Sequence, residues 1–584
     1  MTEKDVLMKL TFKRLLMIQI LSSLATFIGP MVDGIIISDF LGPAYMAAFG
    51  IITPIAILTG AVTNIFNAGS QNAAGKYLGQ GKADRINGLL TATVLWGAGT
   101  GIVFTSVLLL FGRSVLALLG AEGETMEMCM DYLSTFAFSI IPMLIMPSLV
   151  GFLQMDNGGK TAVTASCVMT AADVILDLLA VFVFKNGMKG IGLATTVSDI
   201  LAVLVIFTHF LRKDTNLRFT FRDSLVRDIP KVVVCGLPAA AFLLFNAIRV
   251  SAANKIILSV SDLTALAAAS IQNTFRPAVM GFTMGAGITA LLVCSVISGE
   301  ENRHAMRKEL AYILKLGTGI ALALTAAVLV LARFPFAALF CIGQPEEFTG
   351  LVAKVIRLFA LSIPFSMVNF IFTYYYQSIR RFLLSAAICF LQNVVYYIGS
   401  IKILSGIMGI DGVWLGYLVS EILTLLTIGI IVWVKVGHFP KSVHDFLLLP
   451  DDFGVVAENR MNVTAVSFEQ ATEISAKITE FCKARGIDSR RTMIAGLCME
   501  ELAVIALKNC RAPRAYVDIY LTCKNGELAI RMRDNSRPFD SSLLSGIPEE
   551  EDPCANVGVR IVLGMAKEVT YNVVLGMNMF SMVI

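Results

Sequence analysis

Charged residues, histidines and paired cysteines are scarce in this 584-residue chain. Charged residues make up 15% of the sequence and there are four histidines, whereas 56% of the residues are hydrophobic. The mean hydropathy is +0.74, which is too apolar for a water-soluble protein of this length. The 47 basic and 43 acidic residues nearly balance, so the net charge of +4 gives no argument for nucleic-acid binding.

The eleven cysteines lie singly between Cys129 and Cys554, with no CxxC pair and no nearby histidine. This pattern argues against a metal site or a disulfide framework and favours small apolar packing residues. The N-terminal MTEKDVLMKLTFKR lacks a small-residue cleavage site before the first apolar run. We therefore expect a cytoplasmic tail followed by a retained helix.

Long apolar runs dominate the first 436 residues. A membrane span needs about 20 residues. Twelve runs reach that length, near residues 13–38, 46–75, 88–111, 132–154, 161–184, 190–211, 230–258, 264–298, 310–333, 350–376, 383–404 and 412–435. The sequence therefore predicts an all-α polytopic membrane protein with twelve transmembrane helices.

Basic residues are concentrated in every second connection. The N-terminal tail, the even-numbered connections and the exit after the last span hold about 21, against roughly 6 in the odd-numbered connections. The connection between the sixth and seventh spans alone contributes six, from Arg212 to Lys231. Because Lys and Arg are retained inside, we expect both termini on the cytoplasmic side of the plasma membrane.

An internal repeat divides the membrane part in two. FAFSIIP ending at Pro142 recurs as FALSIP ending at Pro364, and Ser198-Asp199 recurs as Ser420-Glu421, both at an offset of 222 residues. An even number of spans preserves orientation, so the repeat predicts two parallel six-helix lobes, residues 1–222 and 223–436.

The pattern changes after residue 436. A Pro-punctuated linker, 437–450, leads into a segment, 451–584, with soluble periodicity. Helices are expected near 468–485, 489–510 and 557–567. Strands are expected at 515–523 and 527–533, joined by an Asn-Gly turn, with two more strands closing the chain. This order predicts a soluble α/β sandwich.

Three carboxylates inside the spans are candidates for ion coupling. Asp173 and Asp177 lie four residues apart on one helix face near mid-membrane, where a carboxylate costs about 2.5–3.5 kcal/mol. Such a pair resists simultaneous ionisation and forms a natural shared proton site. The alternative is a hydrogen-bonded packing role. Asp33, in the outer half of the first span, either joins the same cavity or is a helix-end residue near the headgroups.

Other polar residues in the spans are candidates for lining a cavity. The second span carries amides on one face, which suit either a hydrated cavity or interhelical hydrogen bonds: Asn64, Asn67, Gln71 and Asn72. Arg249 and Arg276 either snorkel to the headgroups or point inward, where they would attract an anionic group. The run around Tyr374 and Tyr375 adds aromatic surface.

The membrane part resembles the multidrug and toxic compound extrusion (MATE) family. The resemblance lies in VDGIIISDFLGPAYMAAFGIITPI, in Asp173-Val-Ile-Leu-Asp177 and in GMKGIGLATTVS, and it extends diffusely over residues 10–436. It implies antiport of small organic molecules against H⁺ or Na⁺ by alternating access, with Asp33 and Asp177 as coupling residues. The family's usual residue at position 173 is asparagine. The carboxylates that sodium-binding members carry in helices seven and ten are missing, which favours proton coupling.

The last 130 residues resemble the nucleotide-binding domains of anti-sigma-factor and histidine kinases. The resemblance lies in CMEELAVIALKN, RDNSRPFD and NVGVRIV, and it implies an ATP site at Glu501, Asn509, Asp534 and Gly558. Ile505 stands where the family has its magnesium-binding asparagine, so we expect a degenerate domain without phosphoryl transfer. It would act by binding the membrane part or a cytoplasmic protein. The alternative is weak, magnesium-independent nucleotide sensing through Asp534.

Three functions remain open from the sequence. The leading hypothesis is an exporter of small molecules that needs no cofactor beyond its coupling ion and is not an enzyme. A flippase for lipids or lipid-linked sugars of the same superfamily is the nearest alternative. The third is a membrane sensor that signals through the kinase-like domain.

Overall fold

The computed structural model describes residues 6–212, 215–221, 227–261, 263–331, 346–450, 453–510, 515–524, 527–537 and 568–584. The first lobe contains α1 (Val6–Ile36), α2 (Pro43–Gly79), α3 (Ala83–Leu118), α4 (Gly123–Phe136), α5 (Ile140–Met155), α6 (Gly159–Leu178) and α7 (Gly187–Phe210). Short π-helical segments extend α1 to Leu41 and α6 to Val183. We call this unit the N-lobe.

The second lobe, the C-lobe, contains α8 (Ile229–Val260), α9 (Leu263–Gly299), α10 (Arg303–Leu331), α12 (Glu346–Ala360), α13 (Ile363–Ser378), α14 (Phe382–Phe390), α15 (Tyr397–Met408) and α16 (Ile410–Val436). Eleven described helices or continuous helical stretches are long and apolar enough to cross a membrane. The count reaches twelve if α12 and α13, bent by 43° where they meet, form one span. The polytopic helical class is therefore confirmed, and the count of twelve depends on that bent pair.

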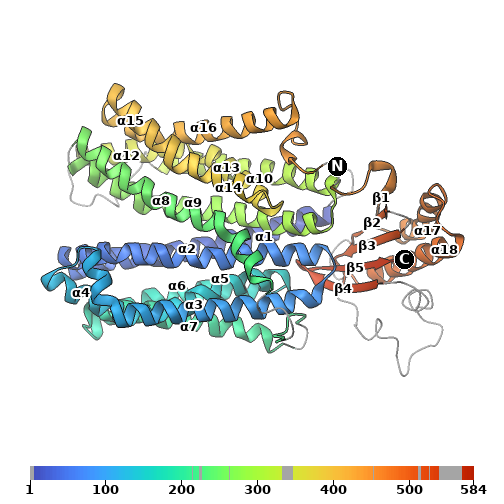
Figure 1. Ribbon diagram of the computed structural model, residues 1–584, viewed down its shortest axis with the longest axis horizontal. Coiled ribbons are helices and arrows are strands. Elements are labelled where there is room, and N and C mark those ends of the chain that lie inside the picture. The colour runs from blue at the N-terminus through green and yellow to red at the C-terminus, as the bar shows by residue number, and fades with distance from the viewer. Residues whose placement is uncertain are drawn as a thin grey trace.

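The two lobes lie side by side and meet along α1, α2, α8 and α9 (Figure 1). Their closest approach is at the end of the bundle that carries the C-terminal domain, here called the domain end. A Cβ atom on Gly69 would lie 2.0 Å from the Val232 carbonyl oxygen, and one on Gly79 would lie 1.9 Å from the Val296 carbonyl oxygen. At the opposite end, a Cβ on Gly50 would meet nothing within 4 Å. Glycine thus lets the lobes close tightly at the domain end.

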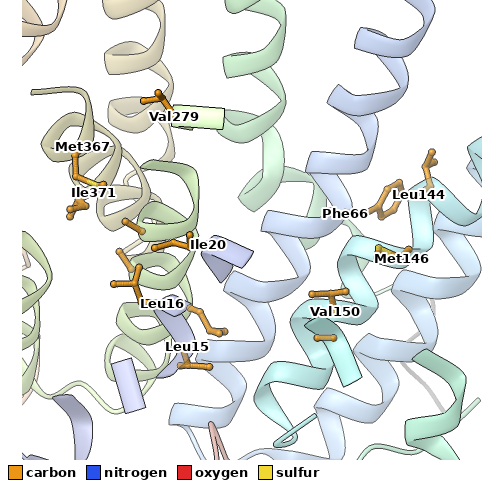
Figure 2. Packing of buried hydrophobic residues seen from close by; sticks show 14 of the residues in the cluster. Leu15, Leu16, Ile20, Phe66, Leu144, Met146, Val150, Val279, Met367 and Ile371 are labelled. Atoms are coloured by element: carbon orange, nitrogen blue, oxygen red, sulfur yellow. The ribbon is translucent and has the colours of Figure 1, made fainter. Parts of the chain in front are cut away.

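A shared apolar core continues across this junction. Figure 2 shows buried side chains of α1 and α2 together with side chains of α5 in the N-lobe and of α9 and α13 in the C-lobe. The labelled residues are Leu15, Leu16, Ile20, Phe66, Leu144, Met146, Val150, Val279, Met367 and Ile371. All ten belong to one contiguous cluster, so the lobes are packed as one body in this state.

The C-terminal domain contains a five-stranded antiparallel sheet in the order β1-β2-β3-β5-β4. Its strands are β1 (Arg460–Ala465), β2 (Val517–Lys524), β3 (Glu527–Asp534), β4 (Glu568–Val574) and β5 (Met577–Val583), and α17 (Phe468–Lys483) and α18 (Ser489–Lys508) share a core with the sheet. The sequence did not predict β1. The helix expected near 557–567 and the Asn-Gly turn at 525–526 lie outside the described residues.

The C-terminal domain contacts both lobes. At the tip of the β4–β5 hairpin, the buried Leu575 donates its N–H to the Met155 carbonyl (2.9 Å) and accepts a hydrogen bond from Arg14, both in the N-lobe. On β3, Arg533 forms an ion pair with Glu300, which directly follows α9 of the C-lobe. The domain therefore spans the seam between the lobes at its closed end.

Candidate functional site

The three carboxylates singled out in the sequence meet inside the N-lobe. Asp33 of α1 and Asp173 and Asp177 of α6 are all buried, and one carboxylate oxygen from each lies within 4.8 Å of the other two. We call this group the carboxylate cluster. The i,i+4 spacing places the α6 pair on one face. Asp33 joins them through packing of α1 against α6, which the sequence left open.

Close packing between α1 and α6 fixes the geometry of the cluster. Thr170 donates a hydrogen bond to the Ala25 carbonyl (2.9 Å), which ties α6 to α1 one turn away from the carboxylates. Gly29 leaves room for the Asp173 side chain, since a Cβ there would lie 3.0 Å from Asp173 Oδ2. Ser198 of α7 donates to Asp173 Oδ1 (3.1 Å). Three helices therefore hold the cluster together.

The cluster lacks compensating positive charge in the part of the chain that the structure describes. No lysine or arginine pairs with these carboxylates there, and both oxygens of Asp177 and Oδ1 of Asp33 have no hydrogen-bond donor. Buried carboxylates this close cannot all be ionised at low cost. A proton shared between them, or a small cation held by their oxygens, would supply what the protein does not.

Two further residues adjoin the cluster and were not predicted as site residues. Asp199 of α7 is buried close enough to Asp173 to interact electrostatically. Tyr132 of α4 is buried close enough to all three carboxylates to interact with them electrostatically. The internal repeat could have pointed to Asp199. Nothing in the sequence indicated that Tyr132, which lies on a separate helix, would pack beside the carboxylates.

The C-lobe has a different polar core. Arg249 lies over the rings of Tyr397 (5.3 Å) and Tyr417 (5.1 Å), and Arg276 contacts the Met280 sulfur at 3.0 Å. Glu421 accepts hydrogen bonds from Asn369 and Gln392, both 2.7 Å long. Both arginines and Glu421 line a cavity of about 30 Å³. The arginines are thus buried inside the lobe and do not reach the surface by snorkelling.

The amides of the second span are used mainly for packing. Asn64 donates to the Gly60 carbonyl (3.0 Å) and Gln71 to Asn67 Oδ1 (2.6 Å), both within α2. Asn72 donates across the seam to the Gln377 carbonyl (2.7 Å) and lines a cavity at the domain end. The hydrogen bonds of these amides run within α2 or across the seam between the lobes.

Tyr374 and Tyr375, which we expected to line a cavity, make packing and hydrogen-bond contacts in this structure. The Tyr375 hydroxyl donates to the Leu447 carbonyl (2.8 Å) of the linker, because the ring points toward the domain end. Tyr374 is packed in an apolar cluster with Phe370, and its ring lies against Gly287 of α9. These tyrosines join α13 to its neighbours.

In the C-terminal domain, Asp534 is buried at the end of β3 opposite Asn578 of β5. Asn578 donates to Asp534 Oδ1 (2.7 Å), as does the Ser536 backbone N–H (2.8 Å). Burial raises the pKa of the Asp534 carboxyl, and the hydrogen bonds from Ser536 and Asn578 oppose that shift. An internal amide therefore bonds one oxygen of the carboxylate that the kinase resemblance assigns to an adenine amino group.

The remaining candidate nucleotide residues do not converge on Asp534 in the described part of the chain. Glu501 is half-buried on α18, and Asn509 is exposed where α18 ends. The Asn509 backbone carbonyl accepts from the Arg537 N–H (3.3 Å), so this end of α18 lies near the segment after β3. Gly558 lies outside the described residues.

Comparison with known proteins shows which family the membrane part matches. The MatE family model matches residues 19–179 and 238–400. Multidrug export protein MepA of Staphylococcus saprophyticus is 20% identical over 404 residues, covering 68% of this chain and 87% of that protein.

Two solved structures share the fold, and each comparison covers 72% of this chain and 94% of the other. One is an outward-facing multidrug resistance MATE family transporter of the MOP superfamily (TM-score 0.68, 19% identity). The other is a MOP superfamily transporter from Pyrococcus furiosus (TM-score 0.64, 19% identity), whose binding pocket is described as having reverse polarity.

A bundle of two helical lobes, each with buried ionisable groups, is typical of membrane transporters. The family match covers more than half of the chain. The chain belongs to the MatE family, as its sequence resemblance predicted. The matched residues end at 400, before the C-terminal domain.

Proposed function

We propose that the chain exports small organic molecules in exchange for protons by alternating opening of its two lobes. The observation that carries the proposal is the carboxylate cluster, three buried acids with no cation beside them in the described part of the chain. A site that must hold protons to reduce its negative charge when closed, and can release at least one when hydrated, has the property that proton-driven transport requires. The MepA relative, named a multidrug export protein, supports the substrate class.

The decisive experiment reconstitutes the full-length chain in proteoliposomes. A pH gradient is imposed, and a pH-sensitive dye reports substrate-dependent proton movement while uptake of a fluorescent organic cation is followed. We expect coupled fluxes that vanish when a protonophore collapses the gradient. Transport driven by a sodium gradient at constant pH would replace the proton by Na⁺ at the same carboxylates. Absence of both fluxes would reject the antiport proposal.

The C-lobe supports a second substrate class. Arg249 and Arg276 line one cavity and are opposed by a single carboxylate among its lining residues, Glu421. At about 30 Å³ the cavity is too small for a phosphate in this state. If it widens when the lobes open, its polarity would suit an anionic group, such as the phosphate of a lipid or a lipid-linked sugar. Testing both substrate classes in the same liposomes separates an exporter from a flippase. A flippase would move a fluorescent anionic lipid between the leaflets and would not transport the cationic dye.

The C-terminal domain, in this proposal, regulates transport by binding the bundle and carries no phosphoryl-transfer activity. Ile505 offers no oxygen to magnesium, and Asn578 already donates to one oxygen, Oδ1, of Asp534. The domain also touches both lobes, so its attachment favours the state closed at the domain end. Calorimetry of the full-length chain with ATP, with and without magnesium, tests this. Magnesium-dependent binding, or transfer of labelled phosphate to a cytoplasmic protein, would favour the sensor alternative.

A further inference from the structure

A cationic cavity lies between the lobes at the domain end, apart from the carboxylate cluster and the C-lobe arginines. Its volume is about 280 Å³. Three segments line it: the end of α2 with the start of α3, the start of α8, and the turn between α13 and α14. Five of the lining residues are cationic, and none of the described lining residues is acidic: Lys76, Lys82, Arg85, Lys231 and Arg380.

Two acids near the cavity whose side chains the structure describes, Asp228 and Glu301, are already engaged. Asp228 accepts hydrogen bonds from Lys231 (2.8 Å) and from the Tyr77 hydroxyl (2.9 Å), and these bonds hold the pKa of its carboxyl below the usual range although burial alone would raise it. Glu301 pairs with Lys524 of the C-terminal domain at 3.7 Å. Within the described residues, Lys76 and Arg380 have no carboxylate within ion-pairing distance. The cavity therefore keeps an excess of positive charge.

The cations come from both lobes and converge only because the lobes are closed here. Lys76, Lys82 and Arg85 belong to the N-lobe, whereas Lys231 and Arg380 belong to the C-lobe. Beside the cavity, Asn72 donates to the Gln377 carbonyl, and Gln377 donates to the Cys235 carbonyl (2.6 Å). The cations of the two lobes repel each other across the seam. An anion bound between them attracts both sets, so it offsets this repulsion.

We propose that this cavity binds a phosphate-bearing anion, and that the bound anion stabilises the state closed at the domain end. Lysine and arginine side chains are the usual partners of phosphate oxygens, and a cavity of this size accommodates more than one phosphate group. Since the two sets of cations separate when the lobes part, the anion binds the closed state more tightly and shifts the equilibrium toward it. The shared chemistry fits two sources, an anionic phospholipid headgroup or a soluble oligophosphate.

The native Cys235 gives a direct readout. It is buried and lines the cavity, so we expect a thiol reagent to reach it faster when the seam opens and more slowly when an anion fills the cavity. The exposed Cys167 on α6 serves as an internal control. Full-length protein in neutral detergent, stripped of lipid, is alkylated over time, and the two cysteine peptides are quantified by mass spectrometry. Pyrophosphate is added in one arm and dihexanoyl-phosphatidylglycerol in the other. Sodium chloride at matched ionic strength and dihexanoyl-phosphatidylcholine are the controls.

We expect the anionic probe to slow Cys235 alkylation about fivefold or more and to leave Cys167 unchanged. The double variant Lys82→Gln/Arg380→Asn should lose the protection. Asparagine is chosen because Arg380 has a positive φ of 64°. Lys82→Arg/Arg380→Lys should keep the protection, as should Lys160→Gln, which removes an exposed lysine of α6 outside the cavity. Protection by pyrophosphate alone identifies a soluble ligand, and protection by the glycerol lipid alone identifies a headgroup.

Three results would overturn the proposal. The first is no protection by either anion at saturation. The second is equal protection by sodium chloride, which would reduce the effect to charge screening. The third is undiminished protection in Lys82→Gln/Arg380→Asn. None of these readouts depends on transport, so the anion site can fail while the antiport proposal stands.

Discussion

The two lobes share a backbone plan but use buried charge in opposite ways. The N-lobe gathers Asp33, Asp173 and Asp177 with no cation among the described residues beside them. The C-lobe surrounds one acid, Glu421, with amide donors, and two arginines line the same cavity. Glu421 therefore balances part of the positive charge of the C-lobe within the protein, whereas the carboxylate cluster of the N-lobe has no described cation to balance it.

The internal repeat shows where this difference lies. At the 222-residue offset, Asp199 corresponds to Glu421, so one buried acid is common to both lobes. Asp173 and Asp177, in contrast, correspond to Val395 and Gly399. The pair that makes the N-lobe cluster therefore has no counterpart in the C-lobe. The carboxylate cluster therefore occurs in one half of the repeated fold only. Under the proposed function, this favours a division of labour between coupling in the N-lobe and substrate contact in the C-lobe.

The strongest test of this division is Asp177→Asn set against Glu421→Gln. An amide keeps the volume of the carboxyl group but cannot release a proton. Asp177→Asn should reduce gradient-driven export to background, while Glu421→Gln should leave proton coupling measurable. Proton flux in proteoliposomes, at matched protein content, is the measurement. Full coupling in Asp177→Asn, or loss of coupling in Glu421→Gln with normal insertion, would break the comparison.

Stability should respond in the reverse order. Arg249→Gln removes a buried guanidinium held over two tyrosine rings and weakens the compensation of Glu421, so we expect a loss of about 2–4 kcal/mol. Asp177→Asn should leave stability unchanged or improve it, because it removes a buried acid that lacks a donor. The melting temperatures of both variants in one detergent decide the point. A destabilised Asp177→Asn would instead assign that acid a packing role.

Attachment of the C-terminal domain offers a third comparison. On the N-lobe it uses the buried Leu575 with hydrogen bonds to Met155 and Arg14, and on the C-lobe it uses the ion pair with Glu300. Arg533→Gln leaves Glu300 buried without its partner, at a cost of about 3–5 kcal/mol. Burial alone would lower the pKa of Arg533, but Glu300 raises it above the usual value. Leu575→Ala removes the buried hairpin tip, at a cost of about 2–5 kcal/mol.

Either change should release the domain and speed tryptic cleavage in the 437–450 linker. The matched control, Lys477→Gln, removes an exposed i,i+4 pair on α17 and should cleave like the parent. If Leu575→Ala alone releases the domain, attachment depends on the N-lobe only, and the bridging role is wrong.

Local pattern predicted most elements of the fold. Apolar length placed the spans, because a bilayer sets the length of a helix, and alternation placed β2 and β3 close to their true bounds. The short β1, Arg460–Ala465, was missed because six residues beside a linker give little periodicity. The bend between α12 and α13 was also missed, although Pro364 stands just inside the start of α13.

The candidate site residues were likewise predictable where local spacing decides their position, and not where packing between distant segments does. Spacing placed Asp173 and Asp177 together, but only the packing of α1 against α6 brings Asp33 to them. The burial of Arg249 depends on aromatic rings from α15 and α16, and the destination of Tyr375 depends on the linker. Leu575 carried no sequence signal either, since Leu-Gly there reads as a turn. It holds a positive φ of 54°, which costs a leucine energy that its buried contacts offset.

The smallest effect expected within the cluster is that of Asp173→Asn, which restores the residue usual in the MATE family. Asp173 alone in the cluster accepts a described hydrogen bond from another helix, from Ser198, and an asparagine oxygen can accept the same bond. Export should therefore stay within about threefold of the parent, which corresponds to less than 1 kcal/mol in coupling. The measurement is the pH dependence of dye export. The midpoint should move to lower pH, because removing one of two neighbouring carboxylates makes the other easier to ionise. If Asp173→Asn is as damaging as Asp177→Asn, the two carboxylates hold one proton as a single coupled unit, and the N-lobe differs from the C-lobe by that pair and not by one residue.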